Sequence, residues 1–151
     1  MTQRFRHRHR ALIALILLFG CSNENTESWT ITNPTAGQLF TMTNVEAGIN
    51  AKKISVSGGC SLPNTANNLA VGDNNNNLVS GPYAIASGDA PNNWSKSDVV
   101  LAKPMGASIA TEFPLKIATG RPNPLNPTEI RSHVVQNIKL KVPNPYQMPA
   151  P

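Results

Sequence analysis

Hydrophobic and polar residues alternate with a period of two in several short stretches of this chain. Such alternation places successive side chains on opposite faces of a β-strand. The clearest case is residues 51–57, where Ile54 and Val56 share one face and serines occupy the other. Residues 131–142 alternate in the same way, with aliphatic residues on one face and lysines on the other. Both stretches predict strands with one buried and one solvent-facing side.

Five further stretches have the composition of strands. Pro34 stops the first of them, and Gly81 with Pro82 predicts a bulge or bend inside the third. These candidate strands are residues 29–33, 39–43, 78–86, 94–102 and 108–119.

Asparagine dominates residues 62–77 and forms an unbroken run over residues 74–77. Because asparagine favours turns and is depleted in strands, this region predicts a long exposed loop. At most one short strand is expected in it, near residues 68–71.

The composition favours an all-β fold. The chain has 13 prolines and 10 glycines, and these residues disfavour long helices. About seven short strands within about 115 residues are typical of a single Greek-key β-sandwich. We therefore expect one sandwich domain over residues 29–142, with an aliphatic core because aromatic residues are few. A proline-rich disordered tail over residues 143–151 is expected to follow it.

Four short motifs resemble landmarks of bacterial immunoglobulin-like domains. They are ITNP at residues 31–34, ISVSGG at residues 54–59, NNWS at residues 92–95 and the alternating last strand. The resemblance implies an immunoglobulin-like sandwich. The chain departs from the family in its long segment after Cys60 and in the proline-rich segment before the last strand.

The first 20 residues are organised like a bacterial export signal. Four arginines lie between residues 4 and 10, and an apolar segment follows at residues 11–19. Nine helical residues span only about half of a hydrocarbon core about 30 Å thick. The segment therefore predicts a helical signal peptide that precedes the sandwich, not a permanent transmembrane helix.

The tetrapeptide LFGC at residues 18–21 resembles the lipobox of bacterial lipoproteins. The resemblance implies that residues 1–20 are a lipoprotein signal peptide and that Cys21 is the lipid attachment site. Residues 21–28 would then be the lipidated cysteine and a polar tether. Ser22 goes, in enteric bacteria, with sorting to the outer membrane, so we expect a lipid-anchored protein of the bacterial cell envelope at that membrane, with the inner membrane left open. An ordinary secretory signal and an uncleaved N-terminal anchor are the alternatives.

Removal of the signal changes the charge of the chain. Four of the 13 basic residues and none of the 8 acidic residues lie in residues 1–20, which leaves a net charge of +1. Nucleic-acid binding needs clustered lysine and arginine, so we expect no nucleic-acid partner. The pairs Lys52 with Lys53 and Lys139 with Lys141 are interpreted as solvent-facing sides of strands.

The chain has two cysteines, Cys21 and Cys60. If Cys21 is acylated, Cys60 has no partner for an intramolecular disulfide. We then expect Cys60 to be a half-buried, small hydrophobic residue at the end of a strand. A disulfide between the two cysteines would exclude the lipoprotein interpretation.

The sequence offers no catalytic or metal-binding constellation. His133 has no partner at a recognisable spacing, the carboxylates are scattered, and no nucleophile motif occurs. Asp73, Asn75 and Asn77 have the spacing of the first calcium ligands of an EF-hand, but Leu78 takes the place of its glycine. We therefore expect no enzymatic activity, no cofactor and no metal.

The interpretation that these features favour is a lipid-anchored envelope protein presenting a non-catalytic sandwich for interaction or structure. The first alternative is a module for carbohydrate or cell-wall polymer, in which Trp94, Tyr83 and the asparagine-rich loop form the site. The second is an accessory subunit of an envelope complex, whose long loop contacts another envelope protein.

Overall fold

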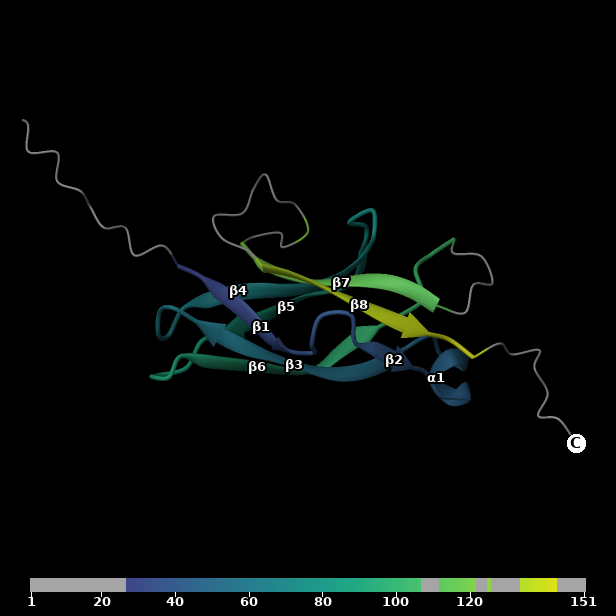
Figure 1. Ribbon diagram of the computed structural model, residues 1–151, viewed down its shortest axis with the longest axis horizontal. Helices are drawn as coiled ribbons and strands as arrows, with labels where there is room; N and C mark the ends of the chain where they lie inside the picture. The colour runs from purple at the N-terminus through teal and green to yellow at the C-terminus, as the bar shows by residue number, and fades with distance from the viewer. Residues whose placement is uncertain (1–26, 107–111, 122–124, 126–133, 144–151) are drawn as a thin grey trace, which may run out of the picture.

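The computed structural model describes residues 27–106, 112–121, 125 and 134–143 of this chain. The predicted signal peptide, Cys21, His133 and all but the first residue of the predicted tail lie outside the described residues. Within them, the chain forms eight strands and one short helix, arranged as two sheets packed on each other (Figure 1).

The two sheets differ in size. The smaller, antiparallel sheet has the order β1 (Trp29–Asn33), β3 (Lys52–Cys60), β6 (Asn93–Leu101). The larger sheet has the order β2 (Leu39–Thr41), β8 (Val134–Lys141), β7 (Glu112–Gly120), β4 (Ala66–Asp73), β5 (Leu78–Ala86). The helix α1 (Asn44–Gly48) joins β2 to β3.

The two packed sheets form a β-sandwich. The chain changes sheet between β1 and β2, and β2 pairs in parallel with β8 while the other paired strands are antiparallel. Only β4 with β5 and β7 with β8 are consecutive strands of one sheet. The predicted all-β sandwich is therefore confirmed, with eight strands in place of about seven.

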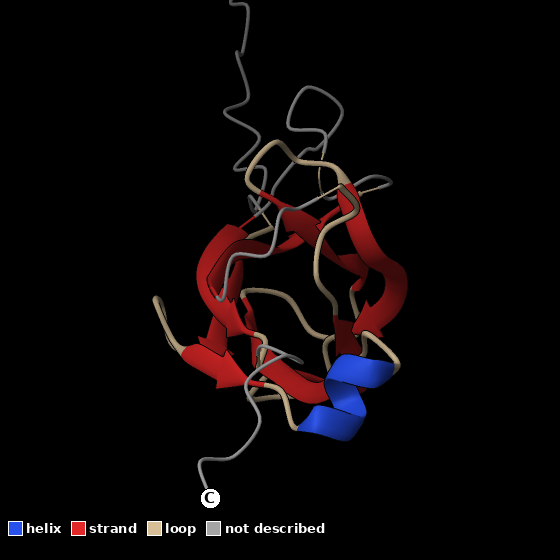
Figure 2. Cartoon of the chain, turned by 90° about the vertical axis from the view of Figure 1, so that its right-hand side faces the viewer, coloured by secondary structure: helices blue, strands red, loops and turns tan. Residues whose placement is uncertain are grey.

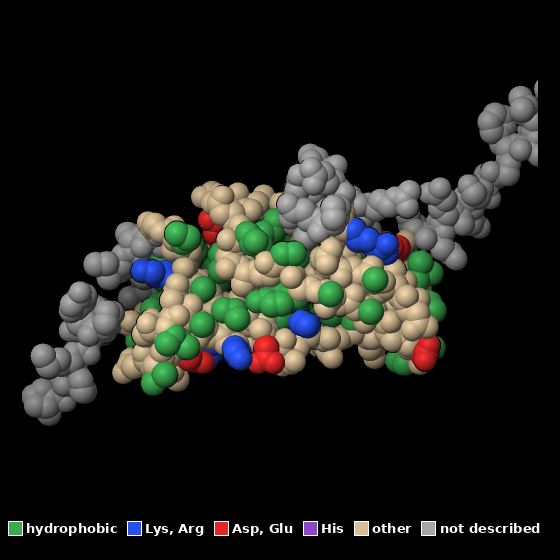
Figure 3. Space-filling view, turned by 180° about the vertical axis from the view of Figure 1, so that it is seen from behind, with side chains coloured by type: hydrophobic (Ala, Val, Ile, Leu, Met, Phe, Trp, Pro, Cys, Tyr) green, Lys and Arg blue, Asp and Glu red, His purple; other side chains and the backbone are tan. Residues whose placement is uncertain are grey.

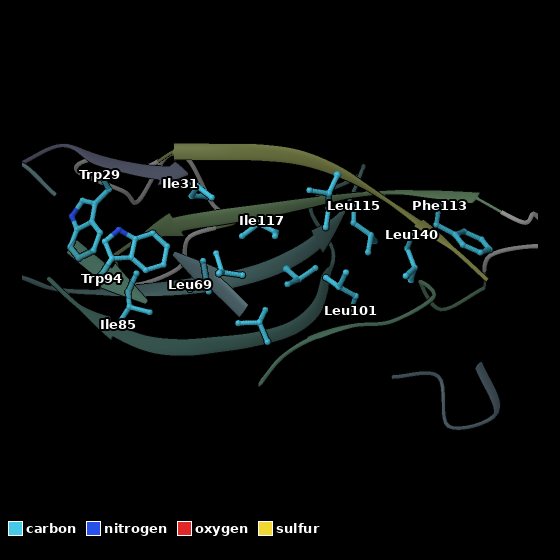
Figure 4. Close-up of a cluster of buried hydrophobic side chains, with 14 of the residues drawn as sticks. Trp29, Ile31, Leu69, Ile85, Trp94, Leu101, Phe113, Leu115, Ile117 and Leu140 are labelled. Atoms are coloured by element: carbon cyan, nitrogen blue, oxygen red, sulfur yellow. The ribbon is translucent and has the colours of Figure 1, made fainter. Parts of the chain in front are cut away.

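The core fills the space between the sheets along the whole length of the molecule (Figure 4). At one end the indole rings of Trp29 and Trp94 are 5.9 Å apart between centroids and tilted by 55°, an arrangement favoured for aromatic pairs. The rest is mainly aliphatic, as predicted. Its fully buried large residues are Val56, Leu69, Val71, Val99, Leu101, Leu115, Ile117, Ile138 and Leu140.

The asparagine-rich region is not the long exposed loop predicted from its composition. Residues 66–73 form β4, which lies between β7 and β5 in the larger sheet. Leu69 and Val71 point into the core, and Ala70 is buried on the other face. Burial on both faces outweighs the poor strand propensity of the flanking asparagines. Residues 62–65 and 74–77 remain outside strands, and residues 74–77 form a tight turn between β4 and β5.

The strand β3 continues past the predicted end of its pattern, through Gly58 and Gly59 to Cys60. Gly58 permits close packing, because a Cβ atom there would lie 1.8 Å from the carbonyl oxygen of Thr30 and 2.9 Å from the indole of Trp94. In β5, the pairing with β4 shifts between Ser80 and Tyr83. The bulge predicted at Gly81 and Pro82 is thereby confirmed.

Candidate functional site at the loop end of the sandwich

Three segments lie toward the end of the sandwich that is opposite the start of β1 (Figures 1 and 2), and residues from all three line one groove. We call this the loop end and define it as α1 with Ile49 and Asn50, the β4–β5 turn with Leu78, and residues 102–106 after β6. Four large apolar side chains are exposed there, and Figure 3 shows hydrophobic side chains reaching the surface at the same end, on its left. Their exposed fractions are 76% for Val45, 71% for Ile49, 56% for Leu78 and 102% for Met105.

The helix α1 is held by interactions at its first turn. Glu46 N–H donates to Thr43 Oγ1 at 3.2 Å, and Thr43 N–H donates to Glu46 Oε2 at 2.7 Å. This reciprocal pair is a capping box, which satisfies helix donors that would otherwise lack partners. The Lys52 ammonium, in β3, adds an ion pair with Glu46 at 3.1 Å. The capping box orders a helix of only five residues, and the ion pair with Lys52 joins this helix to β3.

The same contacts act on the carboxyl of Glu46. The backbone hydrogen bond from Thr43, followed by the hydrogen bond from Lys52, lowers the pKa of Glu46 from its ordinary value of 4.5. Both interactions favour the ionised form. The negative charge also lies in the first turn of α1, where it is stabilised by the helix dipole.

Val45 and Ile49 are four residues apart at α1, so they project from the same side of it. Ala47 packs against the core, whereas no residue of α1 itself is fully buried. The helix therefore touches the sandwich with a small side chain and presents its two largest apolar side chains to solvent.

A second interaction joins α1 to the segment after β6. Asn50 Oδ1 accepts from Lys103 N–H at 2.8 Å, and Asn50 Nδ2 donates to the Lys103 carbonyl oxygen at 3.3 Å. A shallow groove runs from this link toward the β4–β5 turn. Its apolar lining comprises Leu78, Val79, Ala102, Pro104 and Met105, and its polar lining comprises Asn50, Asp73, Asn77 and Lys103.

The carboxylate of Asp73 closes the β4–β5 turn. Its Oδ1 accepts from the backbone N–H groups of Asn75 and Asn77, each at 2.8 Å, and its Oδ2 accepts from Asn77 Nδ2 at 2.8 Å. Partial desolvation acts to raise the pKa of Asp73, but the hydrogen bonds from Asn77 and Asn75 outweigh it and the pKa lies below its ordinary value of 3.8. The carboxylate is therefore used within the turn.

The β4–β5 turn also binds the side chain of Lys116. The Lys116 ammonium, in β7, donates to the Asn74 carbonyl oxygen at 2.8 Å and to Asn76 Oδ1 at 3.0 Å. The residues with EF-hand spacing thus form a turn closed on itself. Within the described part of the chain, no three His, Cys, Asp or Glu side chains come together as a metal site would require.

The aromatic platform considered from the sequence does not form. Trp94 is only 3% exposed, and its indole N–H donates to the Gly59 carbonyl oxygen at 3.2 Å. Tyr83 is half-buried, and its hydroxyl accepts from the N–H of Val100. Both rings belong to the packing of the sandwich, because large aromatic side chains gain more from burial than from exposure. The alternative prediction of a sugar-stacking site made of Trp94 and Tyr83 is therefore wrong.

Cys60 and three of the paired lysines also occupy the positions expected from the sequence. Cys60 is the last residue of β3, is half-buried, and its Sγ accepts from Leu62 N–H at 3.5 Å, which confirms the expected strand-end role. Lys53 is exposed and pairs with Asp98 at 3.3 Å on the surface of the smaller sheet. Lys139 and Lys141 are exposed in β8, as expected.

Neither α1 nor its exposed residues were predicted from the sequence. The signal that could have found the helix is the spacing of Thr43 and Glu46, which is that of a capping box. The exposed state of Val45 and Ile49 could not be predicted, because a short apolar pair after a cap is equally consistent with core packing.

No helix among the described residues has the length and apolar character needed to cross a bilayer. No protein-family model, no curated protein and no solved structure matches the chain.

Proposed function

We propose that this chain is a lipid-anchored envelope protein whose sandwich binds a partner protein through its loop end. The observation that carries the proposal is the gathering of four exposed apolar side chains on the connected segments of that end. Leu78 and Met105 line one groove, and Val45 and Ile49 project from α1 at the same end. Single exposed apolar residues are normal on protein surfaces, whereas several large ones at one end favour an interaction site. We infer a non-catalytic role.

The geometry of α1 indicates the chemistry of the partner. Two apolar side chains four residues apart on a short capped helix form an anchor of the kind that enters an apolar groove. Because the capping box and the Asn50 link already order this region, little conformational entropy would be lost on binding. The partner is therefore expected to present an apolar depression large enough for Val45 and Ile49.

The position of the N-terminal side supports the anchoring part of the proposal. The indole N–H of Trp29 donates to Glu27 Oε1 at 2.5 Å, and Arg121 pairs with Glu27 Oε2 at 2.5 Å. The contacts of the sandwich thus begin at Glu27, two residues before the domain boundary predicted from the sequence. A lipid on Cys21 would be linked through five residues that reach about 17 Å when extended. The loop end would then face away from the membrane.

Lipid attachment is tested by labelling cells with an alkyne-bearing fatty acid. The wild-type chain is expected to take up the label and to partition into the detergent phase of a Triton X-114 extract. Cys21→Ala is expected to lose both properties, and Cys60→Ala, the matched control, is expected to keep them. Equal labelling of wild type and Cys21→Ala would disprove lipidation at this residue.

The docking surface is tested by placing a photo-crosslinking amino acid at position 49 of the full-length chain in intact cells. One protein is expected to crosslink there and not at position 135, since Val135 is an exposed apolar residue outside the loop end. That protein, once purified, should bind the wild-type domain with a Kd lowered by about tenfold relative to Val45→Gln or Ile49→Gln. Crosslinks only between copies of this chain, or equal crosslinks from both positions, would contradict the proposal.

A further inference from the structure

We propose that the outer face of the smaller sheet holds a second, separate site that binds an uncharged polysaccharide. The site is a depression lined on three strands by Thr30, Thr32, Ser57, Gly59, Asn93 and Ser95, which we call the Gly59 trough. It lies on the face of β1, β3 and β6, so it does not include any residue of the loop end.

The pairing of the strands explains how these residues come together. Gly59 in β3 lies between Thr30 in β1 and Asn93 in β6, and Ser57 is paired with Ser95. Because side chains alternate between the faces of a strand, these residues share the face opposite to the buried Trp94 and Val56. The centre of the trough is Gly59, which has no side chain, and small polar side chains surround it.

Packing does not explain the glycine at position 59. At Gly58 a Cβ atom would collide with the Thr30 carbonyl, but at Gly59 its nearest neighbours would be Thr30 Oγ1 at 3.4 Å and Asn93 Oδ1 at 3.9 Å. Those are ordinary contact distances, and the φ angle of Gly59 is outside the left-handed region. Glycine inside a strand costs about 0.5–1 kcal/mol relative to alanine. Because no packing contact explains this cost, we infer that the missing side chain at position 59 leaves space for a ligand.

Hydrogen bonds hold the floor of the trough in place. The Gly59 carbonyl accepts from the indole N–H of Trp94 at 3.2 Å, and its N–H donates to Thr30 Oγ1 at 3.1 Å. Trp94 is in turn packed on Trp29 in the core. A ligand would therefore meet an already ordered surface, which lowers the entropic cost of binding.

The chemistry of the lining identifies the class of ligand. Besides Gly58, Gly59 and Trp94, the lining residues carry hydroxyl or amide side chains, which both donate and accept hydrogen bonds, and no charged residue lines the trough. Nucleic acids and charged polymers require cationic or anionic partners, and the buried centre of a protein interface is usually more apolar than this lining. A polymer that offers hydroxyl groups of both hydrogen-bonding types without charge fits this lining, and neutral sugars are such polymers.

The matched variants are Gly59→Val and Ile49→Gln. A valine at position 59 would project into the trough and suits a strand, so the fold is expected to persist, as checked by thermal unfolding. Ile49→Gln alters the loop end and leaves the trough intact. The two variants separate failure of this inference from failure of the proposed protein-binding function.

The isotopically labelled full-length chain is titrated with cellohexaose, maltohexaose and the hexamer of N-acetylglucosamine, and binding is followed by amide NMR. At least one probe is expected to shift the amides of Thr30, Gly59 and Ser95 saturably. Gly59→Val should weaken that binding by about tenfold or more, while Ile49→Gln should bind like wild type. Absence of saturable shifts with all three probes, or unchanged binding by Gly59→Val, would overturn the proposal.

Discussion

The hydroxyl of Tyr83, in β5, accepts a hydrogen bond of 3.1 Å from the backbone N–H of Val100, in β6, although the two strands belong to different sheets. The hydroxyl of Ser80, also in β5, donates to the carbonyl oxygen of Val100 at 2.5 Å. Free polar groups on an edge strand are a template for pairing with another chain. The side chains of Ser80 and Tyr83 therefore satisfy the backbone N–H and carbonyl of Val100 at the edge of β6, where β5 and β6 share no backbone pairing.

Loss of both side-chain hydroxyls should open this edge. Tyr83→Phe combined with Ser80→Ala is expected to lower the free energy of unfolding by about 1 kcal/mol for each hydrogen bond lost. Urea unfolding measures the change, and amide hydrogen exchange should be faster at Val100. Ser97→Ala, an exposed change within β6, serves as the control. Unaltered exchange at Val100 in the double variant would show that the hydroxyls do not protect the edge.

The two neighbouring glycines of β3 should respond in opposite ways to alanine. Gly58→Ala places a methyl group against the Thr30 carbonyl and the Trp94 indole, so a destabilisation of about 3 kcal/mol is expected from overpacking. Gly59→Ala is expected to be neutral or to stabilise by up to about 1 kcal/mol. Chemical unfolding of both variants provides the comparison, and equal losses would contradict the packing difference.

The buried hydroxyl of Thr119, in β7, offers a route to a more stable protein. Its Oγ1 is fully buried and has no hydrogen-bond partner among the described residues. Thr119→Val removes the unsatisfied group with little change of shape and should stabilise by about 1 kcal/mol. That corresponds to a rise in Tm of about 4 °C for a domain of this size. Thr41→Val, at an exposed strand position, should change Tm much less if burial is the cause.

The capping box of α1 predicts a dependence of stability on pH. Because the folded pKa of Glu46 is lowered from 4.5, its contribution is present above that pH and is lost as the pH falls through the folded pKa. Glu46→Gln should therefore be less stable than wild type near neutral pH, and the two should converge in acid. Thermal unfolding between pH 2 and 7 tests this, and a difference independent of pH would show that the charge of Glu46 is not involved.

Several elements could be predicted because their information is local. The alternation of Ile54 and Val56 identified β3, and that of Ile138 and Leu140 identified β8, since each strand has one buried and one exposed face. Gly81 and Pro82 marked the bulge in β5 through their backbone preferences. Composition alone was sufficient for the all-β class.

The candidate site was only partly accessible to such reasoning. Asp73 and the asparagines after it were recognised as a candidate loop, but their closure by Lys116 depends on a residue some forty positions away. Val45, Ile49 and Met105 were not nominated, because exposure of an apolar residue depends on what the rest of the chain covers. One alternative placed Trp94 and Tyr83 together in a surface site. The burial of Trp94 against Trp29 excludes that site.

The sequence by itself determined the strand periodicity, the turn residues and the absence of long helices in the expected fold. It also contains the LFGC motif, from which lipid attachment at Cys21 stays a prediction. The sequence allowed at most one short strand near residues 68–71, and the tertiary structure extended it to residues 66–73 inside the larger sheet, because burial of Leu69 and Val71 against distant strands outweighs local propensity. The tertiary structure also decided which apolar side chains stay exposed at the loop end and which small polar side chains surround Gly59. Both surfaces join residues far apart in the chain, and local preferences carry no information about such contacts.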